Sequence, residues 1–126
     1  MEGLARSPKK LGPDEGKKFQ ILAETGFLKL SGDETGGACA IMEGHTPPQA
    51  GPPPHRHSRE DESFYILEGE YEFIVGSQTI YAPAGTFLFC PRGVAHSFKN
   101  VGTTLARMLI VAQPAGVEKL FEDISE

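Results

Sequence analysis

Short runs of alternating apolar and polar residues recur along the chain from Phe19 onward, and they predict strands rather than helices. Successive side chains of an extended strand point to opposite faces, so this alternation indicates strands with one buried face. Turns rich in glycine and proline separate the runs. The predicted strands cover residues 19–22, 26–30, 38–43, 62–68, 71–75, 79–82, 86–90, 96–99 and 105–112. Many short strands at even spacing predict an all-β, antiparallel barrel or sandwich.

The two ends of the chain depart from this pattern. Residues 1–18 are polar and interrupted by proline and glycine, which predicts a mobile N-terminal tail. After Pro114 the apolar period changes from 2 to 3.6, which predicts a short helix over about residues 115–124 that packs across the sheet or a barrel end. Its apolar stripe consists of Val117, Leu120, Phe121 and Ile124. Residues 19–126 are therefore expected to form one domain that includes this helix.

Composition and charge narrow the class of protein. A chain of 126 residues is large enough for one core, and its 15 glycines and 10 prolines agree with many turns. The net charge of −5 argues against nucleic-acid binding. No apolar run reaches the length of a membrane span, and the N-terminus lacks the apolar core of a signal peptide, so a cytoplasmic location is expected. Cys39 and Cys90 lie in apolar runs and are interpreted as buried thiols.

The first candidate metal ligands in the sequence are His55 and His57, which follow three prolines. Residues i and i+2 of an extended strand share a face, so the two imidazoles can point to one place. Glu62, at the start of the next predicted strand, can bring a carboxylate there. Imidazole and carboxylate together suit a first-row divalent metal. The alternative is that both histidines are solvated loop residues.

His96 is a third candidate ligand, and it completes a longer pattern. In chain order the pattern is His55-x-His57, Glu62, Gly69, Gly85, Pro91-x-Gly93, His96 and Asn100. These residues resemble the two sequence motifs of the cupin family, in order and at family spacing. The short stretch between the motifs, residues 70–84, is typical of small cupins similar to quercetin-dioxygenase-like proteins.

The resemblance implies a single-domain cupin, an antiparallel β-barrel or jelly roll, that binds one divalent metal ion. The implied ligands are His55, His57, Glu62 and His96. Such a set leaves one or two positions open on a six-coordinate ion, and it suits iron, manganese, nickel, cobalt or zinc.

Three neighbouring positions qualify the resemblance. Glu60 shares the strand parity of Glu62, but the spacing to both motif ends favours Glu62 as the ligand. Asn100 is interpreted as a turn residue. The family often has a glycine where this chain has Gln49, and the chain offers Gly51 instead. This departure concerns the conformation of the loop and not the ligand set.

A substrate pocket follows from strand parity. Phe64 and Ile66 share the parity of Glu62, and Phe98 shares that of His96. Further expected lining residues are Phe73, Phe89, Met108 and Ile110. The alternative is that these side chains simply fill a barrel core. Arg92, beside the metal loop, is expected either to meet an anionic group or to lie on the surface.

The resemblance implies three candidate functions. The first is a metal-dependent dioxygenase acting on a small aromatic or hydroxy/keto substrate, with Glu62 also accepting a proton from the substrate. The second is a non-catalytic cupin that binds or senses a small molecule. The third is a metal-assisted isomerase or lyase. We also expect a homodimer in which residues 19–30 supply a strand to the partner barrel.

Overall fold

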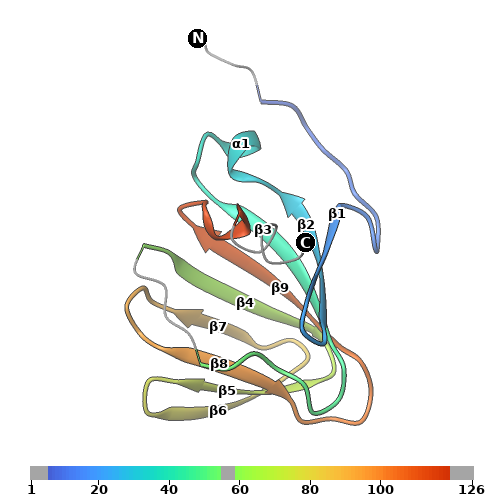
Figure 1. Ribbon diagram of the computed structural model, residues 1–126, viewed down its shortest axis with the longest axis vertical. Coiled ribbons are helices and arrows are strands. Elements are labelled where there is room, and N and C mark those ends of the chain that lie inside the picture. The colour runs from blue at the N-terminus through green and yellow to red at the C-terminus, as the bar shows by residue number, and fades with distance from the viewer. Residues whose placement is uncertain (1–5, 55–58, 120–126) are drawn as a thin grey trace.

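The computed structural model describes residues 6–54 and 59–119, which fold into two antiparallel sheets that face one another (Figure 1). In spatial order, the larger sheet contains β1 (Lys17–Ile21), β2 (Glu24–Leu30), β3 (Ala40–Thr46), β9 (Ala106–Gln113), β4 (Asp61–Glu68) and β7 (Phe87–Cys90). The smaller sheet contains β6 (Gln78–Pro83), β5 (Glu70–Val75) and β8 (His96–Asn100). This architecture confirms the all-β prediction.

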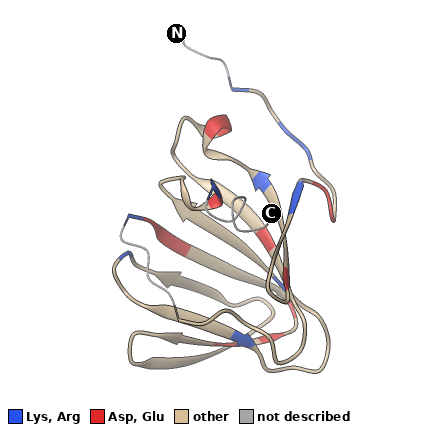
Figure 2. Ribbon diagram, in the orientation of Figure 1, with Lys and Arg blue, Asp and Glu red and all other residues tan. Residues whose placement is uncertain are grey.

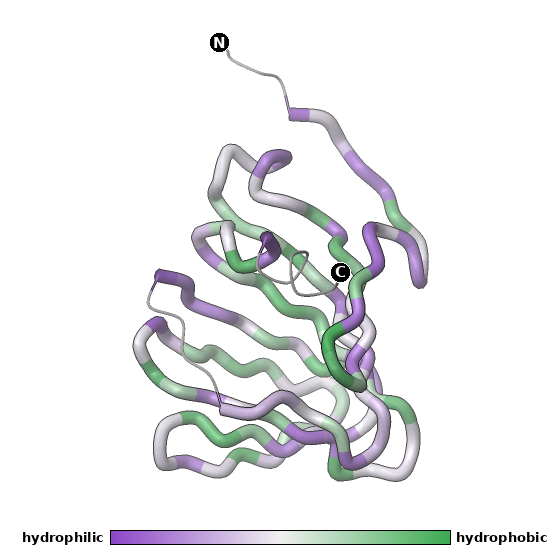
Figure 3. Tube along the Cα trace, viewed as in Figure 1, coloured by the Kyte–Doolittle hydropathy of each residue, from purple (hydrophilic) through white to green (hydrophobic). Residues whose placement is uncertain are grey.

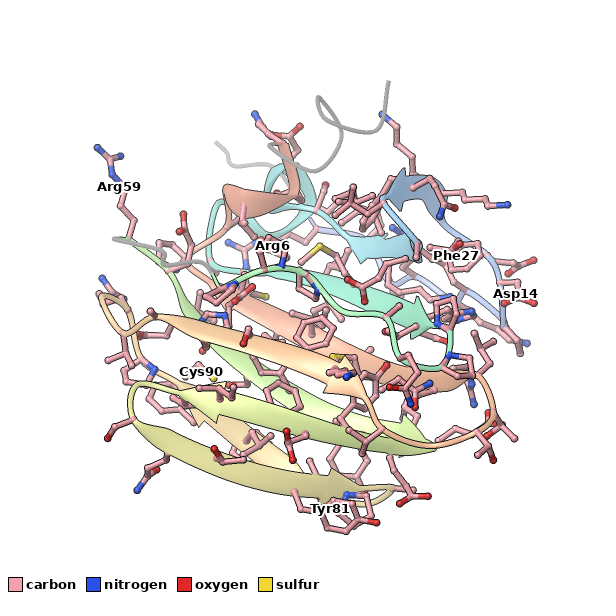
Figure 4. All side chains as sticks on the ribbon, turned by 60° about the horizontal axis from the view of Figure 1, so that its bottom comes forward. Arg6, Asp14, Phe27, Arg59, Tyr81 and Cys90 are labelled. Atoms are coloured by element: carbon pink, nitrogen blue, oxygen red, sulfur yellow. The ribbon has the colours of Figure 1, made fainter. Side chains whose placement is uncertain are left out.

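The core fills the space between the sheets, and alternation along the strands explains its composition. In β4 the even-numbered residues from Glu62 to Ile66 are buried, and in β5 Tyr71 and Phe73 are fully buried. The main core cluster contains Phe64, Ile66, Tyr71, Phe73, Ala82, Cys90, Phe98, Ala106 and Met108. Cys90 is thus enclosed between the sheets, whereas Tyr81 lies on the outer face of the smaller sheet (Figure 4). Period-2 burial of this kind makes the pairing register specific.

The N-terminal segment is hydrophilic and contains no strand or helix over residues 6–16 (Figure 3). It contacts the domain through Lys29, whose ammonium donates to the carbonyl oxygens of Gly12 at 3.0 Å and Glu15 at 2.7 Å. Lys9 also pairs with Glu34 at 2.8 Å. β1 begins at Lys17, so the first strand starts earlier than the predicted boundary at Phe19. The mobility of residues 1–18 stays a prediction.

In the described part of the chain, helical structure occurs at two places. A single turn, α1 (Gly32–Thr35), lies within a segment predicted as a turn, and the Glu34 carboxylate caps it by accepting the Ser31 backbone N–H at 3.0 Å. Near the C-terminus, helical conformation starts at Val117 and runs to Lys119, the last described residue. Val117 packs against Met42 and Ala112, which agrees with the predicted short helix. Among the described residues, no helix is long and apolar enough to cross a membrane.

The proline-rich loop after β3 is anchored by Asn100. The side-chain amide of Asn100 is fully buried and donates to the carbonyl oxygens of Thr46 and Thr104, both at 2.8 Å. Its side-chain oxygen accepts the Gly102 N–H at 2.8 Å. The backbone of Asn100 also pairs with Gln49 and Ala50. Asn100 is thus the last residue of β8 rather than part of the turn itself, and its side chain holds that turn and the proline-rich loop in place.

The two positions at which this loop departs from the family pattern have distinct conformations. Gln49 has φ +69°, in the left-handed region that favours glycine. Gly51 lies so close to β8 that an added Cβ would collide with the Phe98 carbonyl oxygen. The loop therefore keeps a glycine where space is lacking and holds a glutamine where the backbone favours glycine.

We predict that Gln49→Gly raises the free energy of unfolding by about 0.5–1 kcal/mol, because it removes a side chain from a left-handed backbone position. Gly51→Ala should lower it by about 1–3 kcal/mol through the collision with β8. Equilibrium denaturant unfolding measures both changes. The control is Gln78→Gly, at an exposed strand position without a positive φ, which should destabilise. A Gln49→Gly variant as destabilised as Gln78→Gly would contradict the argument.

Candidate metal centre

Two of the predicted ligands, Glu62 and His96, meet inside the protein. Glu62 is the second residue of β4 in the larger sheet, and His96 is the first residue of β8 in the smaller sheet. The His96 Nε2 lies 2.8 Å from the Glu62 Oε1, and each residue is only 3% exposed. The His96 Nδ1 lies 3.3 Å from the Val94 carbonyl oxygen, which orients the ring. The fold therefore brings a carboxylate and an imidazole from separate sheets to one buried point.

Burial and the nearby Glu62 carboxylate shift the pKa values of two residues here, His96 and Cys90. Burial works to lower the pKa of His96, but the hydrogen bond and charge of Glu62 outweigh it, and the pKa is raised. Cys90 lies opposite Glu62 in the pairing of β4 with β7. Burial, aided by the Glu62 charge, raises the pKa of the Cys90 thiol to about 11. Cys90 therefore stays protonated near neutral pH, as expected for a buried structural thiol.

The other two predicted ligands, His55 and His57, lie outside the described residues. Within residues 6–54 and 59–119, no group of three or more His, Cys, Asp or Glu side chains is arranged to hold a metal. The convergence of all four ligands therefore stays a prediction. Glu62 and His96 nonetheless fit it, because a carboxylate and an imidazole held together in an apolar interior are donors that first-row divalent metals prefer.

A small cavity of about 100 Å³ adjoins this pair. Three of the predicted pocket residues, Phe64, Phe98 and Ile110, line it together with Glu62. The remaining lining residues come from β1, β2, β3 and the proline loop, and they are Phe19, Ile21, Glu24, Thr25, Gly26, Met42, Glu43, Gly44 and Pro52. The described part of the cavity wall is thus largely apolar, and its ionisable residues are glutamates.

The other predicted pocket residues do not line this cavity. Ile66, Phe73 and Met108 are fully buried in the core beneath it, which is the alternative interpretation of these side chains. The prediction for Phe89 is wrong, because its side chain is 51% exposed on the outer face of β7. Strand parity explains this placement: Cys90 points inward beside Glu62, so Phe89 must point outward.

Arg92 lies on the surface, in the loop between β7 and β8. Its guanidinium binds Asp61 through Nε–Oδ1 at 3.2 Å and Nη2–Oδ2 at 3.1 Å, and its backbone N–H donates to Oδ1 at 2.8 Å. These bonds lower the pKa of Asp61. Figure 2 shows the acidic start of β4 beside the basic residue of this loop. The charge of Arg92 is therefore paired, and the prediction that it meets an anionic substrate group has no support here.

Sequence reasoning missed the contribution of the β1–β2 hairpin to the cavity. Phe19 and Ile21 share one strand parity, and this signal was available before the structure. The cavity that they line could not be predicted from the local sequence, because it depends on how the β1–β2 hairpin packs in the fold. The Phe19 ring lies over Gly26, where an added Cβ would collide with it. Glu24, the first residue of β2, gave no signal because it resembles an ordinary turn carboxylate.

Comparisons with known proteins agree with this fold and with the sequence motifs. Residues 42–112, more than half of the chain, match the family model described as "Cupin domain". An uncharacterized Streptomyces coelicolor protein is 33% identical over 55 residues, which cover 44% of this chain and 51% of that protein. A germin-like protein, subfamily 2 member 2, of Arabidopsis thaliana is 39% identical over 62 residues, covering 45% of this chain and 28% of that protein. The chain thus spans about half or less of these curated relatives.

Among solved structures, the chain is similar to a predicted oxalate decarboxylase from Thermotoga maritima, with a TM-score of 0.70 and 27% identity. That similarity covers 72% of this chain and 80% of the other. The match to the family model spans both sequence motifs. The chain belongs to the cupin family.

Proposed function

We propose that this cupin holds one divalent transition metal ion and acts as an oxygenase on a small hydroxy or keto compound. The observation that carries the proposal is the buried pair of Glu62 and His96 beside an apolar cavity. His55 and His57 complete the proposed ligand set. A metal of this class, whether iron, manganese, nickel, cobalt or zinc, supplies Lewis acidity, and iron can also bind dioxygen.

The cavity supports a small, mostly apolar substrate. Its volume of about 100 Å³ is well below the roughly 300–1,000 Å³ typical of drug-sized ligands. Its ionisable lining residues are glutamates, and none of the described lining residues is Lys or Arg. Away from the proposed metal ion, a dianion such as oxalate would find no Lys or Arg among the described lining residues to neutralise its charge. We therefore favour uncharged hydroxy and keto compounds over the substrate class named for the Thermotoga relative.

Glu62 has a second role in this proposal. Its carboxylate is buried, and its Oε1 lies 2.8 Å from an imidazole nitrogen of His96. A carboxylate in this position can accept a proton from a substrate hydroxyl that enters the cavity, while His96 stabilises the charge around it. The same residue would therefore serve both as a ligand and as the proton acceptor.

We predict that Glu62→Gln lowers metal affinity more than about tenfold, because an amide replaces the anionic donor while shape is preserved. His57→Ala should have a similar effect. Elemental analysis of purified untagged protein measures the metal content. Glu60→Gln is the matched control, since it removes one carboxylate of the same strand parity outside the proposed ligand set. Equal metal content in the Glu62 and Glu60 variants would contradict the assignment.

We predict oxygen consumption above background by the metal-loaded protein with at least one of two small probes, a β-diketone or a catechol. Glu62→Gln should reduce the rate by about 10²–10⁴-fold, the range for loss of a proton acceptor. Phe89→Ala, on the outer face, should leave it unchanged. Background oxygen uptake with every probe and a full metal site would refute the oxygenase. A ligand that raises the Tm and is recovered unchanged would instead identify a binding module.

We also propose a homodimer. β1 pairs with β2, β2 pairs with β3 of the same chain, and β1 and β7 are the two edge strands of the larger sheet. Beside the β7 edge, an outer apolar surface is formed by Tyr65, Leu67, Phe87 and Phe89, all exposed. Light scattering should give twice the 13.6 kDa chain mass, and Phe87→Ser should shift the mass toward the monomer. A monomeric wild-type mass would refute this proposal.

A further inference from the structure

Glu24 places a further carboxyl group in the cavity, on a strand that carries none of the predicted metal ligands. It is the first residue of β2, and it pairs with Ile21 across the β1–β2 hairpin. Both residues line the cavity that Glu62 also lines. Neither cupin motif includes Glu24, and it lies far from His96 in the sequence. Its presence in an apolar wall therefore needs a separate explanation.

A buried hydroxyl relay fixes the Glu24 carboxyl group. The Tyr71 hydroxyl donates to the Thr46 Oγ1 at 2.8 Å, and the Thr46 hydroxyl donates to the Glu24 Oε2 at 2.7 Å. Tyr71 and Thr46 are both fully buried. Each hydroxyl has one proton, so this direction of donation leaves the Glu24 Oε2 as an acceptor. A proton bound by Glu24 must then be on Oε1, for which no hydrogen-bond partner exists in the described part of the chain.

The surroundings of Glu24 favour its protonated form. Burial raises the pKa of Glu24, and the hydrogen bond from Thr46 only partly opposes that shift. Burial also raises the pKa of Tyr71, with the Glu24 charge as a further cause, so Tyr71 remains a hydrogen-bond donor. Among residues 6–54 and 59–119, the other ionisable residues that line the cavity are Glu62 on β4 and Glu43 on β3. The Glu43 carboxylate binds Arg107 and His45, each at 2.8 Å.

We propose that Glu24 is a specificity-determining residue that donates a hydrogen bond from Oε1 to a carbonyl or hydroxyl oxygen of an uncharged ligand in the cavity. Thr46 and Tyr71 are positioning residues that hold the acceptor oxygen in place. Ionisation of Glu24 removes the donor and adds a negative charge, so the same residue selects against carboxylates. This inference rests on the proposed binding of a small hydroxy or keto compound.

Acetoin and lactate test this selectivity as a matched pair, because lactate has a carboxylate oxygen where acetoin has a methyl group. Calorimetric titrations compare wild type, Glu24→Gln and Glu24→Leu from acidic to mildly basic pH. Wild-type affinity for acetoin should fall as pH rises through the Glu24 pKa, because the donor is lost. Glu24→Gln keeps a donor without titrating, so its affinity should stay constant across the range. Glu24→Leu should bind acetoin about tenfold more weakly at acidic pH.

The affinity for lactate and the metal content of each variant are two further measurements. At the basic end of the range, Glu24→Gln should bind lactate more tightly than wild type, because a like charge has been removed. Metal content should be the same in all variants, since Glu24 is not a proposed ligand. The control is Glu72→Gln, an exposed residue of β5, which should behave as wild type.

The possible outcomes separate this inference from the proposed function. Equal pH dependence of acetoin binding in wild type and Glu24→Gln would overturn the role of Glu24 alone. Absence of acetoin binding to wild type would overturn both this role and the proposed ligand class. The predicted binding pattern together with background oxygen uptake would support Glu24 and overturn only the oxygenase. The Glu24→Gln comparison alone decides the outcome if the leucine variant fails to fold.

Discussion

The contact between Glu62 and His96 is the interaction on which the interior depends. It joins the larger sheet to the smaller one, and it keeps two polar groups at a place where water has almost no access. Removing a carboxylate from water is costly unless partners compensate for it, and replacing one member of such a pair removes part of that compensation. The pair is thus a weak source of stability but a strong constraint on register, because each residue must arrive at the same depth.

The surrounding strands satisfy that constraint. β4 alternates between outward polar or exposed residues and the inward series Glu62, Phe64 and Ile66. A shift of one residue would move this series to the outer face. β8 is held at its other end by Asn100, whose buried amide binds two backbone carbonyls. β4 therefore fixes the position of Glu62, and β8 fixes the position of His96.

Much of this arrangement was predictable, because a buried face leaves a period-2 pattern in the sequence. The predicted strands correspond to the observed ones, and parity correctly assigned Phe64 and Phe98 to the interior of the protein. Parity failed at Phe89 because β7 reads Phe-Leu-Phe-Cys, which is apolar on both faces, so the pattern alone did not choose the inner one. The pairing of Arg92 with Asp61 was also beyond local reasoning, because it joins the loop after β7 to the first residue of β4.

The part of the cavity that sequence reasoning missed is the part built by tertiary packing. Phe19 can lie over β2 only because position 26 is glycine, and neither residue signals the other in the sequence. Glu24 belongs to the interior only through Thr46 and Tyr71, which come from two other strands. Local patterns indicate which face of a strand is buried, whereas the partners of a half-buried carboxyl group such as that of Glu24 depend on the whole fold.

The β1–β2 hairpin walls the cavity from an edge of the larger sheet, and β1 pairs with β2 alone. Substitutions in this hairpin can therefore reshape the cavity without disturbing Glu62, His96 or the strands that hold them. Descendants of such a chain could acquire new ligand preferences through a few exchanges near the N-terminus while inheriting an unchanged interior. Divergence of this kind would be invisible to any classification based on the two histidine motifs.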